Sequence, residues 1–388
     1  MHHGMLTVYK EKGYTSSDAV ARLRGIMRMR KIGHTGTLDP DAEGVLPMCL
    51  GNATRICELI ADREKEYVAV MRLGVRTDTQ DMSGQILARI PDEKVLEILK
   101  SKDRDPAGSA ALAGVDEQQL LSADVFDADP EEGRVICKKI LDTAASFTGE
   151  IEQIPPMYSA IKVNGKRLYD MARKGISVER KPRRITIYSL RIEKVELPLV
   201  TMRVRCSKGT YIRTLCEDFG NALGTGAAMQ SLLRTRVGNF TLEEALTLDQ
   251  LEEIAKSDPL SLSSLIRPVD SFFADLPAAV CTDDALRLLK NGNPLTQGEL
   301  RFLCPEEDPL RSVASPADSG EETGTSADCD RSYDRDGDEE ISLPGIEPGQ
   351  QVIRMYDEAG SFYGLYRSSP GQRGRTRFSA YKMFLPES

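Results

Sequence analysis

Two acidic, weakly apolar segments limit how this chain can fold. Residues 101–133 carry 2 basic and 9 acidic side chains, and residues 303–342 carry 3 basic and 13 acidic ones. Segments of this composition bury too little apolar surface to offset the entropy that is lost when a chain becomes ordered. We expect the second segment to be largely disordered and the first partly so, which leaves the core to the rest of the chain.

The rest of the chain is long enough for two domains. The chain has 388 residues, 40% of them hydrophobic, which exceeds the usual length of one domain and allows sizeable cores. We expect a larger domain over residues 1–274, with the first acidic segment as an insertion. A small β-rich domain is expected over residues 275–388, interrupted by the second acidic segment.

The distribution of charge matters more than its sum. The whole chain carries −9, which argues against a nucleic-acid partner. The two acidic segments account for −7 and −10, so the remainder carries +8. A polyanionic partner is therefore compatible with the folded part.

Other features point to a reduced, cytoplasmic protein. No apolar run approaches the length of a membrane span, and the first residues show no secretion signal. The eight cysteines are scattered without a CxxC pair, and there are three histidines. Neither a disulfide framework nor a zinc site is predicted.

Periodicity predicts helices mixed with strands. Residues 66–75 alternate like a strand, with Tyr67, Ala69 and Met71 on one side. Residues 184–197 and 197–206 predict a hairpin of β-branched strands. Without a regular βαβ rhythm, the class is α+β. Further predictions are a helix over 16–32 capped by Ser16 or Ser17, a helix over 135–149, a turn at Lys208–Gly209 followed by a helix, and two strands around a turn at Glu358–Gly360.

The stretch GHTGTLDPDAEGVLP, Gly33 to Pro47, is the main candidate for chemistry. Pro40 fixes its own φ and restricts Asp39, so a flexible, hydroxyl-rich turn holds one carboxylate rigidly. Preorganised carboxylates serve as nucleophiles or general bases. An Asx-turn, in which Asp39 only caps its neighbours, fits the same residues equally well.

Three known motifs do not fit this stretch. A calcium-binding EF-hand that starts at Asp39 would need an acidic ligand at its twelfth position, which is Leu50. A phosphatase nucleophile would follow a buried apolar strand, whereas Asp39 follows a turn-forming GHTGT. A P-loop needs GxxxxGK[ST], which neither Gly33 nor Gly36 begins.

The stretch resembles the signature of the TruB family, the stand-alone bacterial tRNA pseudouridine-55 synthases. Four further motifs of that family follow in order within residues 5–274: KEYVAVMRLGVRTDTQDMSG, IPPMYSAIKVNGKRLYDMARKG, CSKGTYIRTL and LLRTRVG. The resemblance implies a catalytic domain with a central mixed or antiparallel sheet flanked by helices. The tail resembles a PUA domain, an RNA-binding module. One departure is KEKGYTSSD, where Glu11 replaces the proline that is common in the family.

The resemblance also implies residue roles. Asp39 is the catalytic nucleophile or base, and Arg213 pairs with it and keeps it ionised. Tyr67 stacks on the extruded uracil, with a part in proton transfer. The expected substrate-binding residues are His34, Tyr211, Leu233, Asp81, Lys162, Arg183 and Arg184. We expect His34 to be partly exposed and to contact RNA by stacking rather than to act as a base.

A basic segment between Tyr158 and Arg184 supports an RNA ligand. It holds nine cationic side chains against two acidic ones, with Tyr158 and Tyr169 interleaved. A solvated helix face is the plain alternative, but the excess charge and the aromatics favour phosphate contacts. The cations are Lys162, Lys166, Arg167, Arg173, Lys174, Arg180, Lys181, Arg183 and Arg184.

The leading hypothesis is therefore a monomeric isomerase of the tRNA T-loop, without guide RNA. The reaction breaks the N-glycosidic bond of a uridine, turns the base and rejoins it through carbon, so no cofactor, ATP or metal is expected. Two alternatives remain open: a tRNA-folding chaperone without catalysis, and an α+β hydrolase that uses Asp39 on a small substrate.

Overall fold

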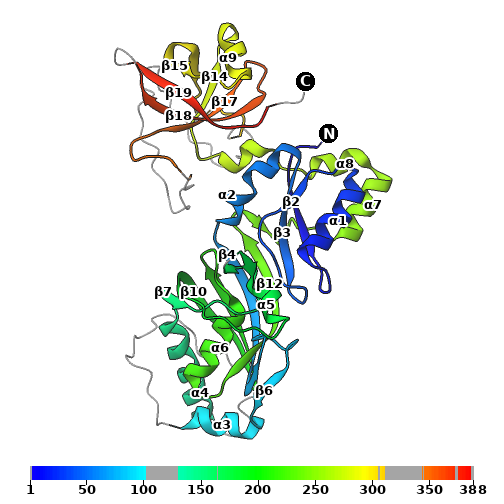
Figure 1. Cartoon of the computed structure of the whole chain (residues 1–388), viewed down its shortest axis with the longest axis vertical. Helices are drawn as coiled ribbons and strands as arrows, with labels where there is room; N and C mark the ends of the chain where they lie inside the picture. Colours follow the sequence, from blue (N-terminus) through cyan, green and yellow to red (C-terminus); the bar gives the residue numbers. More distant parts are fainter. Residues whose placement is uncertain are drawn as a thin grey trace.

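The computed structural model describes residues 2–101, 130–163, 165–304, 306–310, 343, 345–371 and 375–385. It contains a nine-stranded sheet within residues 4–241 and a six-stranded sheet within residues 278–383, at opposite ends of an elongated molecule (Figure 1). The predicted α+β fold with a β-rich second part is confirmed. The acidic segments predicted to be disordered lie mostly outside the described residues.

The larger sheet is mixed. Strands β3 and β12 are parallel, and the other neighbouring pairs are antiparallel. The main path runs β1 (Gly4–Lys10), β3 (Glu43–Leu50), β12 (Ala227–Val237), β4 (Lys65–Leu73), β11 (Leu199–Cys206), β10 (Arg183–Glu196) and β7 (Gly149–Gln153), with β2 (Ile32–His34) on β3 and β13 (Phe240–Thr241) on β12.

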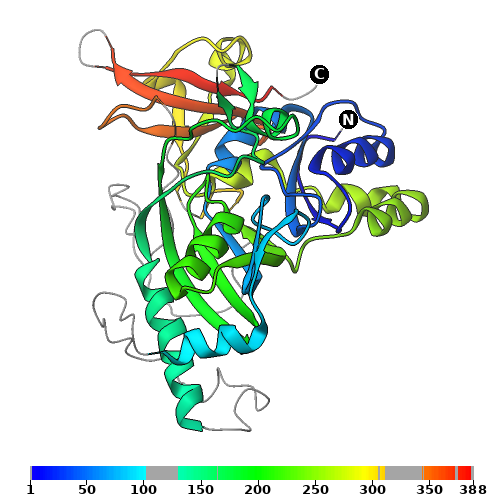
Figure 2. The same cartoon turned by 60° about the horizontal axis from the view of Figure 1, so that its bottom comes forward.

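Helices cover one face of the β4–β7 half of this sheet. Tyr67, Ala69 and Met71 alternate inward along β4, as predicted, and share one apolar cluster with the helices. These helices are α3 (Asp92–Lys100), α4 (Pro130–Ser146) and α6 (Ile212–Leu223). Figure 2 shows α3 and α4 at the end farthest from the six-stranded sheet. The other face carries ion pairs such as Arg203–Glu66 and Arg236–Glu64.

Small elements complete the first part of the chain. Helices α1, α7 and α8 pack against β1 and β3 through a second apolar cluster. The elements are α1 (Ser16–Met27), the 3-10 helix Gly51–Ile56, α2 (Cys57–Ala61), β5 (Val75–Thr77), β6 (Ile86–Arg89), β8 (Lys162–Val163), β9 (Lys166–Arg167), α5 (Leu168–Ala172), α7 (Leu248–Ser257), α8 (Pro259–Ser264) and the 3-10 helix Val269–Phe273.

Most predicted elements form, with local corrections. The β10–β11 hairpin is confirmed, and α6 follows a turn in which Gly209 has a φ of 80°. The predicted cap of α1 is wrong: Thr15, not Ser16 or Ser17, is the N-cap. Thr15 and Asp18 form a capping box that satisfies two backbone N–H groups.

The six-stranded sheet is also mixed, because β14 and β17 are parallel. Gly360 has a φ of 80° at the predicted turn between β17 and β18. In spatial order the strands are β15 (Leu295–Thr296), β19 (Thr376–Met383), β18 (Phe362–Pro370), β17 (Val352–Tyr356), β14 (Ala278–Cys281) and β16 (Leu300–Phe302), with the short helices Asp283–Ala285, α9 (Leu286–Lys290) and Gln297–Glu299.

One apolar cluster joins the two parts. Met5 and Val45 of the larger sheet pack in the same cluster as Phe273, Leu365 and Phe384. Polar contacts support this junction: the Asn52 amide donates to the carbonyl of Leu385 at 3.4 Å, and the Arg55 guanidinium donates to the carbonyl of Met383. None of the helices in the described residues is long and apolar enough to cross a membrane.

Candidate active site

The turn between β2 and β3 holds Asp39, and three anchors fix that turn. The Leu38 N–H donates to the Ser16 hydroxyl at 2.9 Å. The buried Lys10 ammonium donates to the carbonyls of Ala42 at 2.6 Å and Pro40 at 3.1 Å. The Gly13 N–H also donates to Pro40, at 2.9 Å, so the turn at Glu11 still supports the loop. Asp39 is therefore positioned by residues on both sides.

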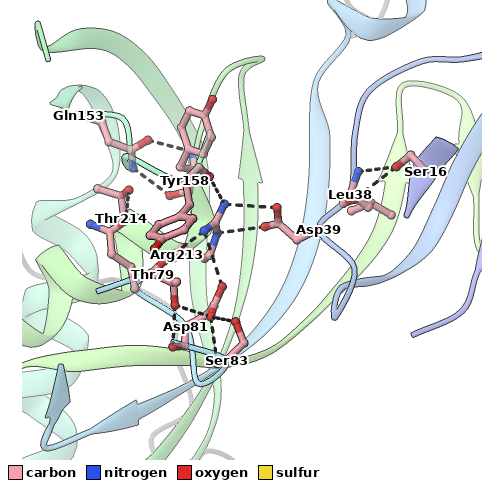
Figure 3. A network of polar contacts seen from close by, with 12 residues as sticks. Ser16, Leu38, Asp39, Thr79, Asp81, Ser83, Gln153, Tyr158, Arg213 and Thr214 are labelled. Carbon is pink, nitrogen blue, oxygen red and sulfur yellow. Dashed lines mark hydrogen bonds and ion pairs between the residues drawn. The ribbon is translucent and has the colours of Figure 1, made fainter. Parts of the chain in front are cut away.

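Arg213 pairs with Asp39 as expected (Figure 3). Its Nε lies 3.0 Å from Asp39 Oδ2, and its Nη2 lies 3.3 Å from Oδ1. The remaining donors reach the carbonyls of Thr79 at 3.1 Å and Tyr158 at 2.9 Å. The guanidinium side chain is 7% exposed, whereas that of Asp39 is 41% exposed. A buried cation thus holds a carboxylate that a substrate can reach.

Asp81 completes this network from the β5–β6 loop. Its carboxylate lies 3.6 Å from Arg213 Nη1 and accepts from the Thr79 hydroxyl at 2.7 Å and the Ser83 N–H at 3.0 Å. Figure 3 shows Asp81 and Asp39 approaching the guanidinium from different sides. The Asp81 side chain is 17% exposed, less than that of Asp39, and it lies on the Arg213 guanidinium.

The pKa of Asp39 corrects one expectation. Burial raises this pKa above its ordinary value, and it outweighs the lowering by Arg213; Asp81 raises it further. We expected the guanidinium to dominate. With its carboxylate poorly hydrated but still accessible, Asp39 is a better proton acceptor and nucleophile than a free aspartate.

Tyr67 lies on the helix-covered face of β4. Its side chain is 7% exposed and packs in the same cluster as Leu38 and Ala42, which lie on either side of Asp39 in the turn. Burial raises the pKa of Tyr67 to about 12, the charge of Arg234 lowers it, and Asp39 is close enough to raise it slightly. The phenol is therefore protonated at neutral pH and lies near Asp39.

Leu233 does not lie with Tyr67. In the β12–β4 pairing Leu233 is opposite Val68, whereas Leu232 is opposite Ala69 and Arg234 is opposite Tyr67. Paired residues share a face of the sheet. Leu232, 8% exposed and in the Tyr67 cluster, occupies the face that we expected for Leu233.

The other predicted residues also divide between the face of the sheet that carries the site and the opposite face. The Tyr211 hydroxyl lies close to Ser159 and in the field of Arg183, Arg213 and Asp39, which places it at the site. Arg183 alternates with the buried Ile185 and Ile187, so it lies on the helix-covered face of β10, and Arg184 lies on the opposite face. The side chain of Lys162 lies outside the described part.

His34 is partly buried at the end of β2. Burial and the nearby Arg234 lower the pKa of its imidazole, so the ring is neutral at pH 7. Its Nδ1 atom is buried and has no hydrogen-bond partner among the described residues. A neutral, half-exposed ring of this kind suits stacking on a base.

The basic segment lies directly beside the Asp39–Arg213 pair. Its Tyr158 carbonyl accepts from Arg213, its Tyr158 and Tyr169 rings meet edge to face at 6.0 Å, and the Arg173 guanidinium lies 5.4 Å from the Tyr169 ring. Within the described residues, no carboxylate pairs with its exposed cations, which are Lys166, Arg173, Lys174, Lys181, Arg183 and Arg184. Unpaired cations beside the site are available to phosphates.

Sequence reasoning missed two groups of cations: two buried ones that contact the Asp39 turn, and three that line a hollow next to β2. Lys10 and Arg234 donate hydrogen bonds to the carbonyls of Ala42 and Gly36 in the Asp39 turn. Arg24, Arg28 and Arg30 line a shallow hollow of about 460 Å³ at the end of α1, next to β2. Only the run of arginines before Gly33 could have indicated the hollow, because nothing in a single sequence marks a lysine or arginine as buried.

Across the ranges that the structure describes, no group of three or more His, Cys, Asp and Glu side chains could hold a metal ion.

Comparison with known proteins bears on the whole chain. The model "TruB family pseudouridylate synthase (N terminal domain)" matches residues 24–104 and 94–212, and "tRNA pseudouridylate synthase B C-terminal domain" matches residues 213–274. The tRNA pseudouridine synthase B of Lachnoclostridium phytofermentans is 44% identical over 304 residues, which are 76% of this chain and 85% of the relative. That of Clostridium tetani is 40% identical over 309 residues, 80% of this chain and 91% of the relative.

Solved structures agree in fold. A chain from an H/ACA RNP bound to a substrate RNA containing 2′-deoxyuridine aligns with a TM-score of 0.56 and 22% identity, covering 99% of this chain and 86% of that chain. A chain from a Cbf5-Nop10-Gar1 complex gives the same TM-score, with 23% identity and the same coverage. The expected family is confirmed by the models and the relatives. The chain therefore belongs to the TruB family of pseudouridylate synthases and is a tRNA pseudouridine synthase, an isomerase.

Proposed function

We propose that the protein isomerises uridine 55 in the T-loop of tRNA to pseudouridine, with Asp39 as the catalytic nucleophile or base. The observation that carries this proposal is the Asp39–Arg213 pair, in which a buried guanidinium holds an accessible carboxylate. Isomerisation requires one carboxylate near the sugar and base, and a pocket for the extruded base. Tyr67 and Leu232 supply aromatic and apolar surface on the same face.

RNA binding follows from the cations around that face. The target nucleotide leaves its loop at a cost of a few kcal/mol, and stacking on Tyr67 and His34 returns part of it. The basic segment holds the backbone beside Arg213, through exposed cations such as Arg183 and Lys174. We assign residues 275–388 to a PUA-like module that binds the same RNA. The protein acts as a cytoplasmic monomer without guide RNA.

Tritium release tests this proposal. An unmodified T-arm stem-loop tritiated at uridine C5 is incubated with wild type and with Asp39→Asn, without ATP or added metal. We expect release by wild type alone, and Asp41→Asn, an exposed carboxylate two residues away, to be as active as wild type. Release by Asp39→Asn at the wild-type rate would contradict the assignment of Asp39.

The two alternatives predict different outcomes. A folding chaperone would bind the stem-loop in a gel shift while neither protein releases tritium. A hydrolase of small substrates would not need the basic segment, so it would keep its activity after charge reversal at Arg183 and Arg184. A stem-loop in which uridine 55 is replaced by cytidine tests the position, and it should release no tritium.

A further inference from the structure

Arg234 of β12 is a buried cation without an acidic counter-charge. Its side chain is among the largest that are fully buried, and the residue is 1% exposed. Its Nε donates to the carbonyl of Val45 at 2.7 Å, and its Nη2 to the carbonyl of Gly36 at 3.3 Å. Within the described part of the chain, no carboxylate pairs with it. Burying a cation in this way is costly, so a role besides stability is expected.

The register of the sheet places this cation at Tyr67. Arg234 is the cross-strand partner of Tyr67 on β4 and the parallel partner of Gly44 on β3. A Cβ atom at Gly44 would lie 2.2 Å from the Arg234 carbonyl oxygen, so the two backbones must touch here. The guanidinium and the Tyr67 phenol are close enough that each group favours the charged form of the other. One side chain thus connects Tyr67 with the catalytic turn.

The reaction gives Tyr67 a task that needs such a partner. When the C1′–N1 bond breaks and a C1′–C5 bond forms, one proton must leave C5 and one must reach N1. The Tyr67 hydroxyl can give its proton to N1, whose electron pair comes from the broken glycosidic bond. The phenolate oxygen can then take the proton from C5, and the C–H electron pair restores the ring double bond.

We propose that Arg234 is a positioning residue for Tyr67. Its guanidinium holds the Tyr67 phenol at the base and stabilises the phenolic oxygen while that oxygen carries negative charge. A guanidinium only donates hydrogen bonds, so the phenol proton is left for the substrate. The inference rests on the proposed function and extends it. The titratable groups near Tyr67 are Arg234, Asp39 and Cys206; those near Arg234 include His34, Lys65 and Lys10. Of these, Arg234 opposes the rise in the pKa of Tyr67 most strongly.

Two substitutions and one matched control test this role. Arg234→Met removes the guanidinium, and Arg234→Lys keeps a cation but loses the planar guanidinium with its several N–H donors. Single-turnover tritium release by Arg234→Met should fall about 100-fold while its affinity for the stem-loop stays within twofold. Arg236→Met, on the same strand but the opposite face, should react at the wild-type rate.

A more acidic phenol separates this role from a purely structural one. With 3-fluorotyrosine at position 67, Arg234→Lys should recover at least threefold in rate and shift its alkaline pH profile toward wild type. If Arg234→Met does not fold, Arg234→Lys with and without the fluorotyrosine decides. Full activity of Arg234→Lys, or no rescue by the fluorotyrosine, overturns the inference. The proposed function still stands in that case if the wild type releases tritium. A wild type that releases no tritium overturns both.

Discussion

Each of the two parts of the molecule contains a buried arginine that pairs with an aspartate, and the two pairs differ in the exposure of the aspartate. Beside the six-stranded sheet, Arg354 of β17 and Asp308 are both buried, with side chains 0% and 7% exposed. Arg354 also donates to the Tyr356 hydroxyl at 3.0 Å and to the carbonyl of Leu276 at 2.9 Å. At the candidate site, Arg213 is equally hidden, but Asp39 is 41% exposed.

The exposure of the aspartate distinguishes a closed ion pair, which stabilises the fold, from an open ion pair, which suits the proposed reaction. A closed pair has satisfied every donor and acceptor, so breaking it leaves a buried charge. An open pair fixes the carboxylate by its hidden side and leaves the other side for a substrate. Each substitution below acts on one of the two pairs or on the surface beside them.

Arg354→Met should cause the largest loss of stability. Asp308 would remain buried without its cation, so the free energy of unfolding should fall by about 3–5 kcal/mol. Urea denaturation measures this loss, and tritium release at low temperature should stay near the wild-type rate. Arg377→Met, an exposed arginine of the same sheet, is the control and should change the free energy of unfolding by less than about 0.5 kcal/mol.

Arg213→Met should show the opposite pattern, with a large loss of activity and a smaller loss of stability. The rate of tritium release should fall by about 10²–10³-fold, because the cation that orients Asp39 and balances its charge is lost. The free energy of unfolding should fall less than in Arg354→Met, since water can hydrate the exposed carboxylate. If the two variants lost stability equally and Arg213→Met kept its rate, the distinction between open and closed pairs would be wrong.

Arg183→Glu and Arg184→Glu compare the two faces of β10 beside the open pair. Arg183 shares a face with the site, so its reversal should raise the KM for the stem-loop about tenfold and reduce the salt dependence of binding by about one phosphate contact. Arg184 lies on the opposite face and should have a smaller effect. Equal effects would show that RNA contacts both faces.

Asp39→Asn should have the smallest effect on stability, with a defined sign. The pKa of Asp39 is raised in the folded state, so the folded protein binds this proton more tightly than the unfolded chain. The cost to stability is absent below the unfolded pKa and complete above the folded one. The Tm of Asp39→Asn should therefore exceed that of wild type by a few degrees at most at pH 7, and this difference should vanish in acid.

The sequence predicted what local patterns and motifs encode. Alternation along β4 placed Tyr67 on the correct side, and the motif order brought Asp39 and Arg213 together although they are far apart in the chain. Residue types alone left Asp39 equally consistent with an Asx-turn, so the pairing depended on the family resemblance.

The remaining features depend on tertiary contacts. Leu232 and Leu233 are identical neighbours, and only the β4–β12 register decides which one faces Tyr67. The pKa of Asp39 was expected to be low because its cationic partner was evident in the motif, whereas the burial that raises it was not. The anchors Lys10 and Arg234 were missed for the same reason, since both residue types are usually exposed.

The apolar cluster between the two sheets has a consequence for modularity. Phe273, Leu365 and Phe384 are covered by side chains of the larger sheet, including Met5 and Val45. Separating the chain near residue 274 would expose apolar surface on both pieces, and each would be prone to aggregation. The β-rich part would therefore need a new apolar partner surface if it were transferred to another protein.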